Sequence, residues 1–112
     1  MKAKLKLNGK EVVILDIEKM RGIGKFTGLM FKPKETNALL FEFGKGRKEI
    51  HSCFCKPFLA IWLLEGKIVD YRMIKPFCLS IVPKQDFDVL IEVPLNKKYS
   101  RVVDFFIEGG KI

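Results

Sequence analysis

The sequence predicts an all-β fold, a small antiparallel barrel-like domain with at most one or two short helical turns. Apolar and polar residues alternate with a period of two in many short segments, as in strands with one buried face. Gly, Asn and Pro punctuate these segments at about the spacing of turns in small barrels and sandwiches. The ten phenylalanines require a dense core, and aromatic residues favour strands.

The expected strands follow one another along the chain. Residues 2–7 alternate strictly, and Asn8-Gly9 is the residue pair typical of a type I′ hairpin turn. Residues 18–27 are expected to be irregular, 44–48 and Glu65-Gly66 to be turns, and 94–100 to be a loop. The other predicted strands are 11–17, 38–43, 49–55, 58–64, 68–73, 77–82, 87–93 and, last in the chain, 101–107.

The segment Phe58–Leu64 is apolar on both faces, so we expect it to lie in the centre of the sheet and to be covered on both sides. Its neighbours each show one polar face, as the wall of a barrel would. The alternation therefore predicts which of their side chains face the core and which face solvent: Val69, Tyr71 and Met73 inward, and Asp70, Arg72, Asp88 and Glu92 outward.

Length and composition limit the class of protein. The 112 residues are expected to form a single domain, 1–112, large enough for a core without metal or disulfides. The first residues lack the apolar stretch of a signal peptide, and no window approaches the length of a membrane span. Three cysteines agree with a reducing compartment, so we expect a cytoplasmic protein that does not contact the membrane.

A series of short motifs resembles one known family. The chain resembles the domain of unknown function 192 family in its archaeal-type form, from about residue 22 to residue 94. The resemblance implies a compact, mostly β, barrel-like fold and no established activity. The segments that carry it are Gly28-Leu-Met-Phe-Lys32, Leu40-Phe-Glu-Phe43, Ile50-His-Ser52 with Phe54, the strand and turn at 61–69, Lys75-Pro76 and the strand at 89–93.

Position 60 departs from the family pattern. Family members usually carry an Asp immediately before the apolar strand, and Ala60 stands in its place here. A carboxylate at the edge of a core needs hydrogen-bond donors. We therefore expect this chain to lack such donors and to pack apolar neighbours around Ala60.

A metal site is not expected, and no cofactor is implied. His51, Cys53 and Cys55 would share one face of a strand, with Cys78 as a fourth candidate ligand. Side chains two residues apart on a strand are separated by about 6.6 Å. Thiolates that share a zinc ion must come within about 4 Å of one another. Without a bulge these residues cannot bind one ion, and small buried cysteines are the simpler interpretation.

Three functional hypotheses remain, and no catalytic residue is assigned in any of them. The first is a non-enzymatic binding or accessory domain whose partner is unknown. The second is a nucleic-acid-binding module, since a net charge of +8 favours polyanions. The third is a small-ligand or enzymatic domain with a pocket near Gly28, Met30 and His51. Contacts with nucleic acid or another anion are predicted at Lys32, Lys34, Lys45, Arg47 and Lys48.

We predict that Cys53 and Cys55 are buried and bind no metal. At least one of the two thiols should resist labelling by a thiol reagent until denaturant is added, because apolar packing excludes the reagent. The measurement is the number of labelled thiols in native and unfolded protein. Stoichiometric zinc in protein purified without added metal would contradict the prediction.

Overall fold

The structure is a computed structural model that describes residues 1–20, 36–46, 57–75 and 85–109. Of residues 43–46 only the backbone is described. The described chain is mostly β, which confirms the predicted class. Its elements are β1 (Ala3–Leu7), β2 (Lys10–Ile14), β3 (Glu18–Lys19), β4 (Leu39–Gly46), β5 (Phe58–Leu64), β6 (Lys67–Ile74), β7 (Phe87–Pro94), the 3₁₀ turn η1 (Lys97–Tyr99) and α2 (Ser100–Ile107).

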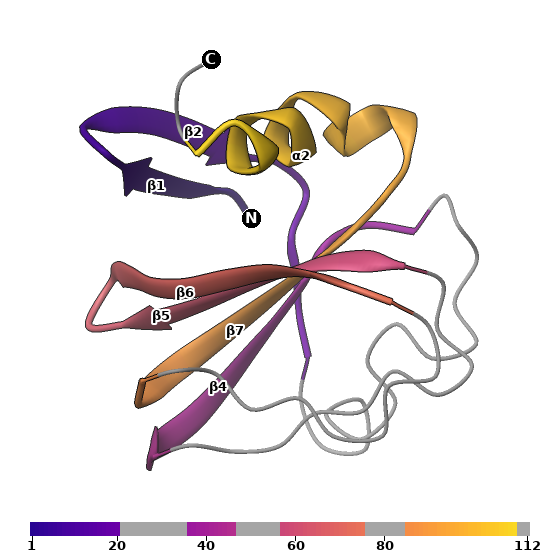
Figure 1. Ribbon diagram of the computed structural model, residues 1–112. Helices are drawn as coiled ribbons and strands as arrows, with labels where there is room; N and C mark the ends of the chain where they lie inside the picture. Colours follow the sequence, from indigo (N-terminus) through magenta and orange to yellow (C-terminus); the bar gives the residue numbers. More distant parts are fainter. Residues whose placement is uncertain (21–35, 47–56, 76–84, 110–112) are drawn as a thin grey trace.

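The strands form two sheets in separate layers (Figure 1). The larger sheet has the order β3-β4-β7-β5-β6, and only its short β3–β4 ladder is parallel. The hairpin β1–β2 and the helix α2 lie together above one face of this sheet (Figure 1). The described strands do not close into a barrel: the large sheet ends at β3 and β6, and the hairpin is a sheet of its own.

Two of the predicted turns are present, at Asn8-Gly9 and at Glu65-Gly66. Asn8 and Gly9 both have positive φ, 51° and 79°, as a type I′ turn requires. Glu65 and Gly66 repeat this conformation with φ of 52° and 80° between β5 and β6. Asn8, Gly9 and Gly66 are residue types that tolerate the left-handed region, and the two tight turns that they favour set the register of both hairpins.

The central strand is the one that the sequence identifies. β5 lies between β7 and β6, and every residue from Phe58 to Leu63 is buried. Its alternate side chains belong to two apolar clusters. The upper cluster, which includes Leu59 and Ile61, fills the space below the hairpin and α2. The lower cluster, which includes Trp62, lies on the opposite face of the sheet.

The last element is a helix, so the prediction of a strand at 101–107 is wrong. Val102, Val103, Phe105 and Phe106 are all buried, and this spacing places them on one side of a helix. Their β-branched and aromatic side chains favour a strand locally, but packing against the upper cluster outweighs that preference. With η1 before it, the helical segment is longer than the one or two short turns predicted.

Two smaller predictions also need correction, and one is not tested. β4 continues to Gly46, so the turn expected from residue 44 does not begin there. The predicted inward set of β6 is also not one buried face: a bulge at Val69 places this residue against the lower cluster, while Tyr71 packs against the upper one. Met73, on the face of Tyr71, is 42% exposed, whereas Ile74 on the opposite face is buried. The predicted strands at 49–55 and 77–82 lie wholly outside the described residues.

The Tyr99 hydroxyl joins segments that are far apart in the sequence. It donates a hydrogen bond to the carbonyl of Leu15 at 2.8 Å and accepts one from the backbone N–H of Ala38 at 2.9 Å. The ring itself is buried in the upper cluster. Tyr99 therefore fixes the link after β2 to the entry of β4.

Neighbours of Tyr99 strengthen this contact. The Asn96 side chain accepts from the backbone N–H of Tyr99 and donates to the carbonyl of Thr36 at 3.0 Å. The Lys98 ammonium lies 2.8 Å from the carboxylate of Asp16. The hydrogen bond between these two side chains lowers the pKa of Asp16 and raises the pKa of Lys98 from their ordinary values.

Among the described residues, no helix is long and apolar enough to cross a membrane.

We predict that Tyr99→Phe lowers the free energy of unfolding by about 1–3 kcal/mol, because the buried N–H of Ala38 loses its acceptor. Urea denaturation followed by circular dichroism measures the change. Tyr71→Phe is the matched control, since the Tyr71 hydroxyl makes no hydrogen bond to any described residue, and its effect should stay within about 0.5 kcal/mol. Equal effects of the two substitutions would contradict the role of Tyr99.

Candidate functional site

Most of the predicted site residues lie outside the described ranges. These are Gly28, Met30, Lys32, Lys34, Arg47, Lys48 and His51. Lys45 belongs to β4, but its side chain is not described. The structure therefore neither brings these residues together nor separates them. Within the described part of the chain, the distinctive polar residues are others, and they gather on the lower face of the large sheet.

A row of charged and small side chains crosses this face, and we call it the charged row. Glu92 of β7 pairs with Ala60 of β5, and Ala60 pairs in turn with Arg72 of β6. Directly paired residues have Cβ atoms about 5 Å apart. The small methyl group of Ala60 thus stands between two long side chains of opposite charge.

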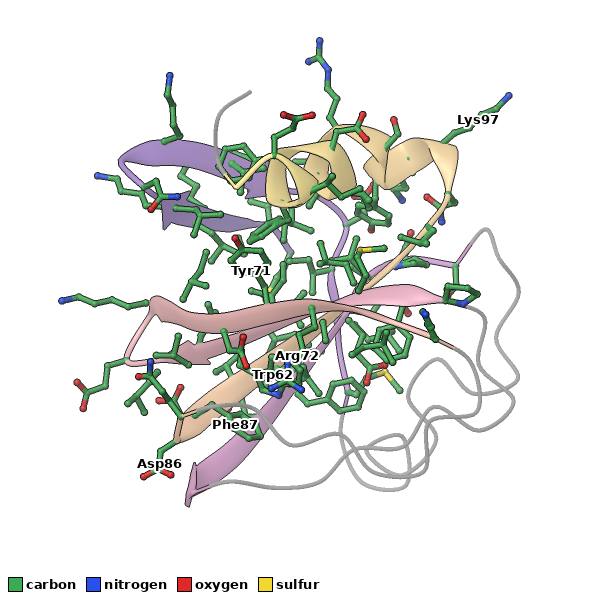
Figure 2. The ribbon with its side chains drawn as sticks, in the orientation of Figure 1. Trp62, Tyr71, Arg72, Asp86, Phe87 and Lys97 are labelled. Atoms are coloured by element: carbon green, nitrogen blue, oxygen red, sulfur yellow. The ribbon has the colours of Figure 1, made fainter. Side chains whose placement is uncertain are left out.

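The neighbouring row adds an acid and an aromatic ring. Trp62 pairs with Asp70 of β6, and the Arg72 guanidinium lies 3.1 Å from the Asp70 carboxylate. The guanidinium carbon also lies 5.5 Å from the centroid of the Trp62 ring. Figure 2 shows Arg72 and Trp62 together on the lower side of the sheet, with Phe87 beside them. The ion pair and the ring hold the Arg72 side chain across the sheet rather than free in solvent.

The side chains of the charged row and of Trp62 beside it differ in their exposure to solvent. Glu92 is 6% exposed and Trp62 is fully buried, whereas the Arg72 side chain is 36% exposed. Solvent therefore reaches the row at its β6 end. On the same strand, Tyr71 points to the opposite face, where its ring packs edge-on against Phe106 at 5.1 Å (Figure 2).

One buried donor at this place has no acceptor among the described residues. The indole N–H of Trp62 makes no hydrogen bond to any of them. Buried polar groups are hydrogen-bonded in the great majority of cases, and functional sites are among the places where exceptions occur. Trp62 also lies edge-on to Phe87 at 6.5 Å, so its ring position is fixed by packing. The N–H is thus a donor held in a rigid place.

The prediction for Ala60 is confirmed in one respect. Ala60 is fully buried in the lower apolar cluster, so apolar neighbours surround it as expected. Arg72 is its partner on the adjacent strand, and the guanidinium of this residue is bonded to the Asp70 carboxylate. The expectation that this chain lacks donors for a carboxylate at position 60 stays a prediction.

Two of these residues differ from their predicted outward, solvent-exposed positions. Glu92 is buried, and the Asp70 side chain is only 8% exposed. Alternation correctly places Asp70, Arg72 and Glu92 on the face opposite to Tyr71, but that face is covered as well. The sequence does contain one indication that both faces are covered. Trp62, the single tryptophan, lies within a strand that is apolar on both faces. No group of three or more metal-binding side chains occurs among the described residues.

Comparisons with known proteins show the fold and no family. No protein-family model matches the chain, and no curated protein matches it. One solved structure, described as a "putative transcription regulator" from Sinorhizobium meliloti, is similar to it with a TM-score of 0.72. The match covers 91% of this chain and 84% of the other at 13% sequence identity. At this identity the likeness establishes a shared fold alone.

We predict that Ala60→Asp destabilises the protein by about 1–3 kcal/mol, because it buries a carboxylate beside Glu92 within an apolar cluster. Ala60→Asn is the control, since it has nearly the same shape without the charge. Chemical denaturation of both variants separates the effect of size from that of charge. An Asp variant as stable as the wild type would mean that Arg72 compensates the new charge fully.

Proposed function

We propose that this chain is a non-enzymatic binding domain whose site is the charged row and the Trp62 indole on the lower face of the sheet. The observation that carries the proposal is the fully buried indole N–H, which has no acceptor in the part of the chain that the structure describes. A bound ligand with a carboxylate or similar oxygen would supply that acceptor. The Arg72 guanidinium next to the ring would attract the same group.

The side chains around the Trp62 indole are suited to the recognition of a ligand. Arg72, Glu92 and Trp62 come from three adjacent strands, and sites built on sheets keep their geometry better than sites on loops. The row contains both signs of charge, so it can select a ligand by the pattern of its polar groups. The partly exposed end at Arg72 provides access from solvent.

Four finer expectations belong to the same proposal. Membership of the domain of unknown function 192 family is supported by the order and spacing of its motifs between residues 22 and 94. A pocket near Gly28, Met30 and His51 would belong to the same site only if these residues adjoin the lower face. A cytoplasmic location is supported by the three cysteines. A barrel-like closure is supported by β1, which lies beside β6.

Nucleic-acid binding is the second candidate, and the distribution of charge favours it. Outside the described residues lie nine of the 21 basic residues but only two of the 13 acidic ones. Most of the net charge of +8 therefore belongs to residues outside the described ranges. The name of the Sinorhizobium meliloti neighbour, a "putative transcription regulator", agrees with this candidate.

The first candidate predicts that small anions change the fluorescence of Trp62, the single tryptophan of the chain. Titration with acetate, succinate or inorganic phosphate should give a saturable change that sodium chloride at equal ionic strength does not. Arg72→Gln and the milder Arg72→Lys should weaken it. Lys67→Gln, an exposed change on the same strand, should leave it intact. Absence of a saturable change for all three anions would refute the proposal.

The second candidate predicts that the double variant Arg47→Ser and Lys48→Ser binds nucleic acid more weakly and with a flatter dependence on salt, because two phosphate contacts are lost. Fluorescence anisotropy with a labelled oligonucleotide at several salt concentrations measures both quantities. If the wild type does not bind at about 100 mM salt, where the Debye length is about 10 Å, nucleic-acid binding is excluded.

A further inference from the structure

The outer face of the β1–β2 hairpin has a basic row beside an apolar row. The inner face is buried at Leu5 and Ile14 in the upper cluster. On the outer face, Lys2, Lys4 and Lys6 are all exposed. Lys4 pairs across the hairpin with Val13, which is half-buried, and the exposed Leu15 follows β2 directly. We call this set of five residues the hairpin face.

The three lysines of the hairpin face are available for an external partner. None of them forms an ion pair with any described residue. Alternate residues of an antiparallel strand are spaced about 6.8 Å apart. The ammonium groups therefore form a line whose spacing is close to that of successive phosphates along an extended single strand of nucleic acid. The one acid on this face, Glu11, pairs with Lys6 at the turn end.

We infer that the hairpin face binds the backbone of single-stranded nucleic acid, with phosphates along the lysines and bases over Val13 and Leu15. The inference rests on the nucleic-acid candidate above and specifies a contact surface for it. Two parallel rows, one basic and one apolar, match the two sides of a single strand, whose phosphates lie along one edge and whose bases lie along the other. A duplex would offer phosphates to the lysines but no base faces to Leu15.

An anionic membrane is a less suitable partner for the hairpin face. A lipid surface attracts basic residues from any direction and does not distinguish a row from a scattered patch. The exposed apolar area is also small, because Val13 is half-buried and Leu15 is a single exposed side chain at one end. Without an exposed aromatic ring on the hairpin face, binding should tolerate any base sequence, since contact with aliphatic side chains discriminates little between bases.

Two triple variants with equal charge test this inference. The first changes Lys2, Lys4 and Lys6 to Ser, and its control changes Lys67, Lys97 and Arg101, which are exposed on β6, η1 and α2. Both lower the formal net charge from +8 to +5. Figure 2 shows Lys97 pointing into solvent on the side of the molecule away from the hairpin. A difference between the variants therefore reflects contacts of the hairpin face rather than the overall field.

The probe is a labelled oligothymidine of about 12 nucleotides, within the range of single-strand site sizes. We expect the hairpin variant to lose at least tenfold in affinity and its logarithmic salt slope to fall by about 2, since each phosphate contact on a single strand contributes about 0.7. The control should change affinity much less. Leu15→Ser should weaken binding without changing the slope. Circular dichroism confirms that each variant is folded.

The remaining outcomes separate this inference from the candidate on which it rests. If the wild type binds and both triple variants weaken equally, the hairpin face is refuted while nucleic-acid binding stands. If the wild type binds neither oligothymidine nor a duplex of the same length, both fail. Preference for the duplex, or lysine-dependent binding to phosphatidylserine vesicles without binding to the oligonucleotide, would also overturn the single-strand assignment.

Discussion

The hydroxyl of Tyr99 is the contact on which the arrangement of the two layers depends. It binds the backbone after β2 and the backbone before β4, and these segments belong to different sheets. The ring brings η1 and the start of α2 against the same place, and the Lys98–Asp16 ion pair adds a second connection at the surface. Without this contact, few directional bonds would remain between the layers, and apolar packing would carry most of the attachment of the hairpin and the helix to the sheet.

Ala60 has a comparable effect on the lower face. A larger residue between Glu92 and Arg72 would displace one of these side chains, since the three are neighbours on adjacent strands. The small side chain lets both charges remain near the centre of an apolar face. Burying them costs free energy unless partners compensate, and Asp70 provides one such partner for Arg72. A protein that needed only stability would be better served by apolar residues here, which is why the row is a reasonable place to look for function.

The sequence predicted best those features that depend on neighbouring residues. The two hairpin turns follow from Asn8, Gly9 and Gly66, which tolerate positive φ, and the strand Phe58–Leu64 follows from its uninterrupted apolar run. It failed at residues 101–107, where packing outweighs the strand preference of Val and Phe. It also failed at Glu92 and Asp70, because alternation identifies the two faces of a strand but not whether both are covered. Only the pairing of β7, β5 and β6 places these charges together, and that pairing is a property of the whole fold.

The hairpin face and the charged row differ in how freely their residues can be substituted without loss of stability. On the hairpin, alternation assigns stability to inner residues such as Leu5 and Ile14 and leaves the outer lysines unconstrained by packing. In the charged row, the same side chains that would recognise a ligand are embedded in the core, so each change there alters stability as well. Binding data alone can therefore assign a role to the lysines, whereas a role for Arg72 or Glu92 requires binding and stability to be measured on the same variants. The fluorescence of Trp62 serves this purpose because it reports from inside the row and also changes when the protein unfolds.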